Sequence, residues 1–358
     1  MRRIAIDVPS RSYEVLVGDG ILRSAGELIP QGDEESIMVL TDRRVRAHWW
    51  DVAKKALNTR GKKLALLEVN PGESSKSFAS AANLLRRMAR RSIRRHDLLV
   101  ALGGGVITDL GGFVASIYQR GIPLVHIPTS LVAQVDAAIG GKTAVNLPQG
   151  KNLTGTFYQP ISVIADTSAV STLPHREYVS GLAEVIKYGL TLDPSLLALI
   201  ADVEPIRNRD AGFLEELVSR CVQLKGRIVS EDERDTSSRA VLNYGHTLGH
   251  ALEAHGGYER WLHGEAISVG MVFAAELSRE LGLVSEDVVA EHRRIFQMHG
   301  LPVSAPFDPE EIAKRWNMDK KNLRGQRWVL LSDLGEWKLV GDVGGAQIQA
   351  ALSRMVAA

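Results

Sequence analysis

The feature that most constrains the fold is an alternation, within the first 170 residues, of short apolar runs with amphipathic segments. Charged residues, glycine or proline bound each run, as expected of strands that are buried on both faces of a sheet. The runs are residues 4–8, 13–17, 36–40 (SIMVL), 64–69 (LALLEV), 98–102 (LLVAL), 124–127 (LVHI) and 161–166 (ISVIAD). Segments 45–59 and 77–91 place apolar residues three and four apart, which predicts helices between the strands. This order predicts a parallel sheet with crossover helices, and therefore an α/β domain.

The pattern changes after the turn at residues 172–174. From Glu177 to about Arg294 nearly every segment has helical periodicity. The predicted helices are 179–190, 213–230, 240–255 and 265–281, and a small hairpin is predicted at 328–331 and 337–340. We therefore divide the chain into an α/β domain, residues 1–170, and a mainly α-helical domain, residues 171–358.

Composition excludes several classes of protein. The 358 residues carry 43 Lys and Arg against 42 Asp and Glu, which leaves no basic field for nucleic acid or an anionic membrane. The single cysteine, Cys221, cannot form an intramolecular disulfide and fits a reducing compartment. No apolar stretch approaches the ~18 residues of a membrane span, and the polar N-terminus does not resemble a signal peptide. We expect a soluble, cytoplasmic protein without a nucleic-acid or membrane partner.

Glycine and acidic residues follow three of the predicted strands. Gly103, Gly104 and Gly105 come directly after the strand at 98–102 and precede a helix, an arrangement that lets backbone N–H groups approach a pyrophosphate. The G-x-G-x-x-G pattern itself is not matched, and a glycine-rich turn alone is as often structural. Asp42 ends another strand, where an acidic side chain can bind a ribose hydroxyl, and residues 71–76 (PGESSK) end a third. Together, the three strand ends favour a nucleotide site.

Histidines and a glutamate in the helical half have the spacing of a metal site. His246 and His250 are four residues apart on one helix face and can both reach one metal ion. Thr247 stands where the H-E-x-x-H motif has its glutamate, so the protease base is missing. His263 and Glu184 offer two further ligands, and a set of histidines and one carboxylate with an open position suits catalytic zinc.

The other histidines and most of the basic residues can be explained without a ligand. We expect His48, His96, His255, His292 and His299 to cap helices or pack in the core. Most basic residues solvate the surface, but Lys142 and Lys151 lie in segments that are too rich in glycine for an ordinary helix face. With other cations near glycines they favour a small, multiply anionic substrate. Asp136 can either orient a basic group or cap a helix.

Long motifs occur in order across the chain. They are PGESSK (71–76), GGGVITDLGGF (103–113), PTSLVAQVDAAIGGKTAVN (128–146), GKNLTGTFYQP (150–160), TLPHRE (172–177), GLAEVIKYG (181–189), LNYGHTLGHALE (242–253) and HGEAISVGM (263–271). Together these motifs resemble the 3-dehydroquinate synthase family of sugar-phosphate cyclases. The resemblance implies a Rossmann-like N-terminal domain that binds NAD and a helical C-terminal domain that binds zinc, for which cobalt can substitute. It places the zinc ligands at Glu184, His246 and His263, and leaves His250 facing the substrate.

The resemblance also implies the remaining site residues. NAD would contact Asp42, Gly72, Glu73, Lys76, Gly105, Val106, Ile107, Thr108, Asp109, Thr129, Ser130, Lys142, Lys151 and Thr172. The substrate carboxylate would meet Lys225 and Arg239. The substrate phosphate would meet Lys142, Asn152, Asn243, His250 and either Lys320 or Lys321. Lys187 and Asp136 would complete the catalytic set, and Arg120 would reach the neighbouring subunit of a homodimer.

The reaction implied is the conversion of 3-deoxy-D-arabino-heptulosonate 7-phosphate into 3-dehydroquinate and phosphate, on the route to aromatic amino acids. It combines transient oxidation by NAD, phosphate elimination, re-reduction and an intramolecular aldol closure. A sister cyclase such as an aminodehydroquinate synthase is the nearest alternative, and a metal-dependent alcohol dehydrogenase is a more distant one.

Overall fold

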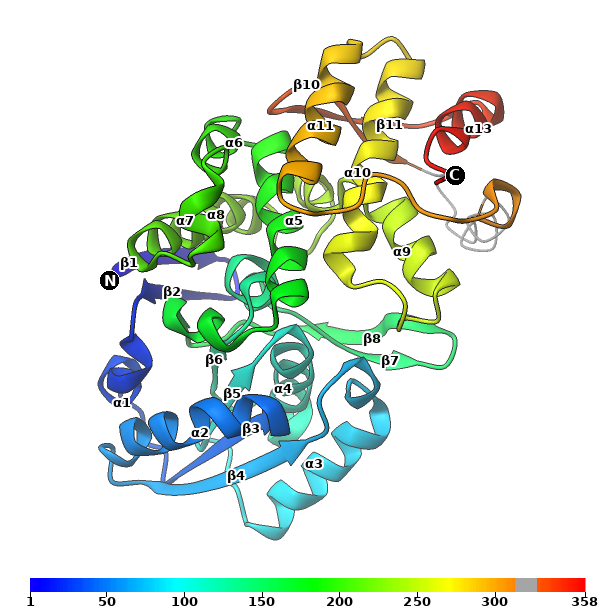
Figure 1. Cartoon of the computed structure of the whole chain (residues 1–358). Coiled ribbons are helices and arrows are strands. Elements are labelled where there is room, and N and C mark those ends of the chain that lie inside the picture. Colours follow the sequence, from blue (N-terminus) through cyan, green and yellow to red (C-terminus); the bar gives the residue numbers. More distant parts are fainter. Residues whose placement is uncertain (313–326, 358) are drawn as a thin grey trace. The chain divides into compact units, whose positions relative to one another are not determined.

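The structure, a computed structural model, describes residues 1–312 and 327–357 (Figure 1). It consists of two compact units. The α/β unit comprises Met1–Pro174 and Asn208–Arg234, and the helical unit comprises His175–Arg207 and Asp235–Ala358. The chain thus leaves the first unit and returns to it once, whereas a single boundary near residue 170 places residues 208–234 with the helical part.

A seven-stranded sheet forms the centre of the α/β unit, in the order β1-β2-β9-β6-β5-β3-β4. Its strands are β1 (Arg2–Val8), β2 (Arg11–Gly18), β3 (Ser36–Asp42), β4 (Lys63–Val69), β5 (Leu98–Gly103), β6 (Leu124–Pro128) and β9 (Ser162–Asp166). Only the pair β1 and β2 is antiparallel, and all other neighbours in this sheet are parallel. The predicted α/β class and its parallel sheet are confirmed.

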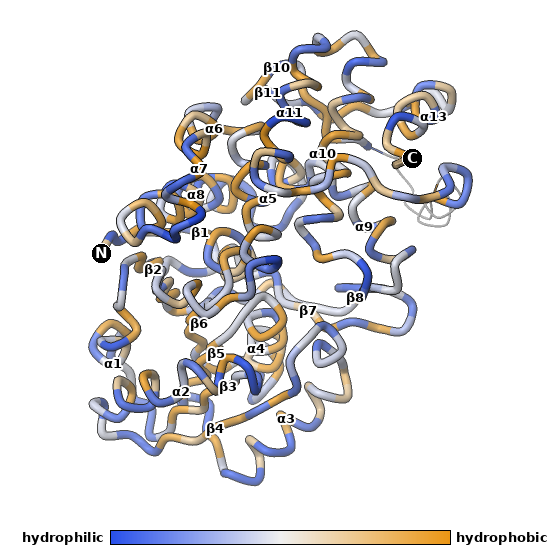
Figure 2. The backbone as a smooth tube through the Cα atoms, in the orientation of Figure 1, coloured by the Kyte–Doolittle hydropathy of each residue, from blue (hydrophilic) through white to orange (hydrophobic). Residues whose placement is uncertain are grey.

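Helices cover both faces of this sheet, which explains why its inner strands β5, β6 and β9 are buried throughout and β3 nearly so. The helices are α1 (Ala25–Leu28), α2 (Arg43–Asn58), α3 (Phe78–Arg90), α4 (Gly105–Ile117) and α8 (Ala211–Glu231). One core cluster joins α3 and α4 to Met38 and Leu40 of β3, and a second joins α1 and α2 to Ile37 and Val39 of the same strand. Figure 2 shows that α4 is apolar along most of its length. Helix α8 packs against β1, where a Cβ on Gly226 would lie 2.3 Å from Ile6 Cδ1.

The strand order places a topological switch point beside β3. The chain runs from β3 outward to the edge strand β4 and then returns to form β5 on the other side of β3. In open α/β sheets, ligands bind at the carboxyl ends of strands at such a point. Here those ends carry Asp42 and the glycines that follow β5.

A second, two-stranded sheet follows β6 and was not predicted. It pairs β7 (Lys142–Leu147) with β8 (Gly150–Phe157), after a π-helical turn η4 (Ala133–Ala137). The hairpin packs against α4 so closely that a Cβ on Gly112 would lie 2.3 Å from Thr143 Cγ2. Short 3₁₀ turns complete the unit at η1 (Ile21–Ser24), η2 (Glu73–Ser75), η3 (Tyr118–Arg120) and η5 (Thr167–Thr172).

The helical unit is built around α10, which packs against α5, α9, α11, α13 and β10. Its elements are α5 (His175–Thr191), α6 (Ser195–Ile200), α7 (Val203–Arg207), η6 (Ser238–Asn243), α9 (His246–His255), α10 (His263–Glu280), α11 (Glu286–Met298), β10 (Trp328–Asp333), β11 (Glu336–Val340) and α13 (Gly345–Ser353). The predicted hairpin is confirmed as β10 and β11. None of the described helices is long and apolar enough to cross a membrane.

The prediction of one continuous helix over 240–255 is wrong. The segment is a 3₁₀ turn followed by α9, and Gly245 interrupts it with a φ of 78°. Only glycine adopts this left-handed conformation without strain, and a Cβ there would also lie 2.6 Å from Met271 N. The interruption starts α9 at His246.

Candidate active site

The turn after β5 presents backbone amides at the start of α4. Gly104 is the N-cap of α4 and has no side chain with which to cap it, and no acidic residue lies in the first turn. A Cβ on Gly104 would lie 3.2 Å from Ser130 Oγ, while Thr129 N donates to Gly103 O over 3.0 Å. The first-turn amides and the positive end of the helix dipole therefore suit an anionic group such as a pyrophosphate. The predicted residues Gly105, Val106, Ile107 and Thr108 form this first turn.

A network of polar side chains joins the loop after β4 to α4 and to the hairpin. Lys76 is buried, and its ammonium contacts both Asp109 Oδ2 and Asn152 Oδ1. Burial raises the pKa of Asp109, while the Lys76 ammonium acts in the opposite direction. Glu73 Oε1 accepts from Asn146 Nδ2 at 2.7 Å, and Asn146 Oδ1 accepts from Asn152 N at 3.0 Å. The structure thus brings together four residues predicted to bind NAD or substrate: Glu73, Lys76, Asp109 and Asn152.

Two other predicted nucleotide residues make local contacts in the same unit. Asp42 caps α2 through one carboxylate oxygen, Oδ1, which accepts from Arg44 N and Val45 N. Thr172 Oγ1 accepts from Trp49 Nε1 at 2.9 Å. Gly72, with a φ of 99°, begins the loop that carries Glu73 and Lys76. The predicted cations Lys142 and Lys151 lie on β7 and β8 respectively.

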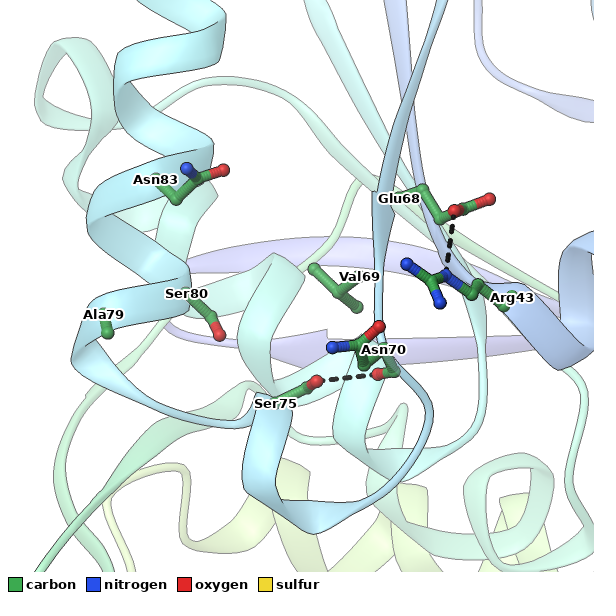
Figure 3. Close-up of a pocket in the computed structure, with 8 residues that line it drawn as sticks. All are labelled: Arg43, Glu68, Val69, Asn70, Ser75, Ala79, Ser80 and Asn83. Carbon is green, nitrogen blue, oxygen red and sulfur yellow. Dashed lines mark hydrogen bonds and ion pairs between the residues drawn. The ribbon is translucent and has the colours of Figure 1, made fainter.

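A pocket of about 360 Å³ lies beside the loop that follows β4 (Figure 3). It opens between β4, the start of α2 and the start of α3, and Arg43 forms an ion pair with Glu68 at its wall. Its lining residues are Arg43, Glu68, Val69, Asn70, Ser75, Ala79, Ser80 and Asn83. Of the residues predicted as catalytic that the structure describes, none lines this pocket.

Lys225 and Asp136 form a second ion pair within the α/β unit. Lys225 Nζ donates to Asp136 Oδ1 at 2.7 Å and to the backbone oxygen of Asp136 at 2.6 Å. Lys225 is on α8 and is 4% exposed, and Asp136 lies in the π-helical turn. Of the two roles predicted for Asp136, the contact fits the orientation of a basic group.

Three side chains converge in the helical unit in the manner of a metal site. The ligand atoms of Glu184, His246 and His263 all lie within 4.8 Å of one another. Glu184 Oε1 is 3.1 Å from His263 Nε2 and 3.6 Å from His246 Nε2. The three residues come from α5, α9 and α10, so tertiary packing alone brings them together.

The glutamate of this group is held in its charged form. Burial raises the pKa of Glu184, but the Lys187 ammonium and the nearby rings of His246 and His263 outweigh burial, so the pKa lies well below the usual range. Lys187 is one helical turn further along α5, pairs with Glu184 Oε2 and donates to Leu242 O at 2.7 Å. An ionised carboxylate and two imidazole nitrogens are ligands that zinc prefers.

The other ring nitrogen of each histidine also has a partner. His246 Nδ1 is 3.1 Å from Tyr244 O, and His263 Nδ1 is 3.6 Å from Glu253 Oε2. Such outer partners orient metal-binding histidines and fix their tautomers. Burial lowers the pKa of His263, but hydrogen bonds to Glu184 and Glu253 raise it to about 10, so this position favours positive charge. The donor set and its surroundings therefore fit a divalent cation.

His250 belongs to a different group from the one that the i, i+4 spacing suggested. The nitrogen and oxygen atoms of His250, Glu253 and His263 form a second set within 4.8 Å, which does not include His246. His250 is exposed, with its ring centroid 5.2 Å from that of His246. The resemblance likewise places His250 outside the metal ligands.

The remaining predicted residues are placed as follows. Arg239 and Asn243 lie on η6, where Arg239 is 1% exposed and Asn243 is exposed. Arg120 is exposed in η3 and has a φ of 61°. Lys320 and Lys321 lie outside the described residues. Sequence reasoning missed Glu253 and Tyr244, although both lie within the LNYGHTLGHALE motif.

Comparisons with known proteins agree with this architecture. Residues 66–180 match the family described as 3-dehydroquinate synthase N-terminal, and residues 181–322 match that described as 3-dehydroquinate synthase C-terminal. A 3-dehydroquinate synthase from Methylococcus capsulatus is 42% identical over 356 residues, which cover 98% of this chain and 99% of the relative. The chain therefore belongs to the 3-dehydroquinate synthase family.

Solved structures show related sugar-phosphate cyclases with the same fold. A 2-deoxy-scyllo-inosose synthase, complexed with carbaglucose-6-phosphate, NAD⁺ and Co²⁺, has a TM-score of 0.90 at 27% identity and covers 99% of this chain and 100% of its own. A 2-epi-5-epi-valiolone synthase from Streptomyces hygroscopicus subsp. jinggangensis, with NAD⁺ and Zn²⁺ bound, has a TM-score of 0.89 at 26% identity and covers 99% of both chains. The predicted Rossmann-like and helical architecture is confirmed by these neighbours.

Proposed function

We propose that the chain converts 3-deoxy-D-arabino-heptulosonate 7-phosphate into 3-dehydroquinate and inorganic phosphate. Full-length similarity to 3-dehydroquinate synthases supports this reaction. The structural observation that carries it is the convergence of Glu184, His246 and His263, with Lys187 paired to the glutamate. Burying charged groups of this kind costs free energy, and a bound metal cation would offset that cost.

NAD and a divalent metal, zinc or cobalt, are the proposed cofactors. The glycines and the Lys76 network at the strand ends would hold NAD, and Glu184, His246 and His263 would hold the metal. When bound, NAD accepts and later returns a hydride, and the metal makes a coordinated substrate hydroxyl more acidic. The solved cyclases that contain NAD⁺ with Co²⁺ or Zn²⁺ support NAD and a divalent metal as the cofactors.

Lys187 is proposed to move a proton at the substrate hydroxyl. Its ammonium is anchored by Glu184 Oε2 and by Leu242 O, so it stays beside a metal-binding carboxylate. With a 1% exposed side chain, Lys187 is shielded from bulk water, and its proton is directed toward groups within the site.

Two further sets of side chains are proposed to bind the anionic groups of the substrate. Lys225 and Arg239, both buried, would bind the carboxylate, and the ion pair with Asp136 would hold Lys225 in position. The phosphate would be bound by Lys142, Asn152, Asn243 and His250, with Lys320 or Lys321. We also propose that the enzyme is a cytoplasmic homodimer in which Arg120 reaches the neighbouring subunit.

The first experiment measures phosphate release from the heptulosonate phosphate with zinc present and NAD far below the substrate concentration. Phosphate in large excess over NAD, without accumulation of NADH, is expected because the cofactor is regenerated in each turnover. Stoichiometric NADH would instead indicate a dehydrogenase. Absence of phosphate release from a protein that binds zinc and NAD would overturn the proposed substrate and direct the assay to the sugar phosphates of sister cyclases.

A matched pair of variants on α8 tests the carboxylate assignment in the same assay. Lys225→Met removes the buried cation and is expected to raise KM about 10- to 100-fold, because a charged hydrogen bond contributes roughly 1.5–3 kcal/mol. Arg227→Met removes an exposed cation two residues away and should leave KM unchanged. Equal KM values for both variants would contradict the role of Lys225.

A further inference from the structure

A tyrosine and a histidine outside the candidate metal ligands form a buried hydrogen bond in the helical unit. Tyr244 Oη is 2.9 Å from His292 Nε2, and both side chains are fully buried. His292 lies on α11, far along the sequence from the ligands, and Tyr244 precedes α9. The burial of His292 fits the prediction that this histidine packs in the core. Core packing alone, however, does not explain why a tyrosine and a histidine form a polar pair there.

The partners of His292 fix the direction of the hydrogen bond. His292 Nδ1 is 2.7 Å from Val288 O, and a carbonyl oxygen can only accept, so Nδ1 carries the proton. Burial lowers the pKa of His292 to about 4, which keeps the ring neutral. Nε2 is therefore an acceptor, and the hydroxyl of Tyr244 donates to it. A second acceptor for this hydroxyl, Met271 O, is further away at 3.4 Å.

The same tyrosine contacts a candidate metal ligand through its backbone. Tyr244 O lies 3.1 Å from His246 Nδ1 and can only accept, so His246 carries its proton on Nδ1 and keeps the lone pair of Nε2. That nitrogen faces Glu184 Oε1 at 3.6 Å. The orientation of the Tyr244 carbonyl thus determines which nitrogen of His246 is presented to a metal ion.

Backbone contacts also restrain this segment: Tyr244 N donates to Val241 O and Gly249 N donates to Gly245 O, both at 3.1 Å. Gly245, which separates the two residues, has no side chain and has a left-handed backbone. Its own carbonyl oxygen lies so close to α10 that a Cβ on Gly270 would be 1.9 Å away. The peptide that follows Tyr244 is therefore located by close backbone packing on one side and by the tyrosine side chain on the other.

We infer that Tyr244 and His292 are positioning residues for the metal ligand His246. His292 anchors the Tyr244 hydroxyl, and the anchored tyrosine holds the carbonyl that fixes the tautomer and orientation of His246. The inference rests on the proposed function, in which Glu184, His246 and His263 bind a divalent metal. Outer partners of this kind typically contribute ~10–100-fold to metal affinity.

The test measures Zn²⁺ affinity by chelator competition, together with the visible absorption spectrum of the Co²⁺-loaded protein. Tyr244→Phe, which keeps the ring and removes only the hydroxyl, is expected to weaken Zn²⁺ binding about tenfold and to alter the Co²⁺ spectrum. His292→Leu should have a similar effect, and the double variant should lose no more than either single variant, because both act through one chain of contacts. His292→Gln offers an amide oxygen to the hydroxyl and should recover most of the affinity.

Controls separate this inference from general destabilisation and from the proposed function. His299→Leu removes another buried histidine of the same unit and should leave Zn²⁺ affinity and the Co²⁺ spectrum unchanged. Provided that the wild-type protein binds one Zn²⁺, either of two results would overturn the inference. One is an unchanged Zn²⁺ affinity in Tyr244→Phe, and the other is a loss of Zn²⁺ affinity in His299→Leu as large as that in Tyr244→Phe. If the wild-type protein binds no Zn²⁺, or His246→Ala binds it as well as the wild type, the metal assignment itself fails.

Discussion

The two candidate binding regions are built by different means. In the helical unit, the metal group consists of side chains from three separate helices, each with a polar partner. In the α/β unit, the nucleotide region consists of backbone amides at the start of α4 and of a side-chain network that joins the loop after β4 to α4 and to the hairpin of β7 and β8. The first arrangement depends on tertiary packing alone, whereas the second includes one part, the turn from β5 into α4, that is set by local sequence.

This difference teaches which changes are tolerated in each region. A metal site requires a fixed number of donor atoms at fixed separations, so the loss of one donor removes the site. A site made of backbone amides has no single side chain to lose, and its charged contacts share the binding energy. Because the two regions lie in separate units, we expect a mutation in one region to leave ligand binding in the other region unchanged.

The largest expected effect is the loss of metal in His263→Ala. Removal of one of three donors should abolish stoichiometric Zn²⁺ binding and activity, while NAD binds with unchanged affinity because its site lies in the other unit. Metal analysis after dialysis and NAD titration by calorimetry would measure both. His255→Ala, which removes a histidine outside the group of Glu184, His246 and His263, is the matched control. Retention of metal and activity in His263→Ala would refute the assignment.

Lys76→Met should weaken NAD binding and leave Zn²⁺ binding intact, the reverse of the result expected for His263→Ala. Loss of the ammonium that contacts Asp109 and Asn152 is expected to weaken NAD about 10- to 100-fold, the range for one charged hydrogen bond, and to leave Zn²⁺ affinity unchanged. The variant also leaves the Asp109 carboxylate without its cation; because the Asp109 side chain is 20% exposed, the expected loss of stability is smaller than the ~3–5 kcal/mol typical of a fully buried pair. Urea unfolding should show this loss.

The double variant Lys76→Met/Asp109→Asn distinguishes a charge effect from a cavity. Asparagine removes the uncompensated charge, so the stability lost in Lys76→Met should largely return, whereas NAD affinity should stay low. If the double variant is no more stable than Lys76→Met, the Lys76–Asp109 ion pair does not account for the loss.

The same contrast explains what the sequence predicted about the fold. The inner strands β3, β5, β6 and β9 were predicted because they are buried along nearly their whole length and are therefore apolar runs in the sequence. The hairpin of β7 and β8 was missed because most of β8 is at least partly exposed, so its residues show no apolar alternation. The break at Gly245 was missed because helical periodicity continues across it, while the left-handed glycine is fixed by contact with α10.

Prediction of the candidate site followed the same division. The glycines after β5 and the acid after β3 were found from local sequence, because a strand end and a helix start are both local features. Glu184, His246 and His263 were proposed as possible ligands from residue type and spacing, but the choice between His246 with His250 and His246 with His263 needed the family resemblance. The part played by His292 could not be predicted, since only the packing of α11 brings it to Tyr244.

The smallest expected effect is a change in the pH dependence of stability when a buried histidine of the α/β unit, His126, is replaced. Both ring nitrogens of His292 have hydrogen-bond partners, whereas one ring nitrogen of His126 has none among the described residues. His126 lies in β6, and its Nδ1 has no hydrogen-bond partner among the described residues. Burial lowers the pKa of His126 from 6.5 to about 3. Because the unfolded chain binds this proton more readily, the histidine contributes stability fully above pH 6.5 and progressively less as the pH falls toward 3.

His126→Leu should therefore flatten the acid side of the stability profile. Below pH 6.5 each such group adds a slope of about 1.4 kcal/mol per pH unit to the free energy of unfolding, and the variant should lack this contribution. Urea unfolding of the wild type and the variant between pH 7 and 4.5 would measure the difference. His96→Leu, which removes an exposed histidine of the same unit, is the control. Parallel profiles for wild type and His126→Leu would show that His126 takes up a proton in the folded state, and would place water or a polar partner at its ring.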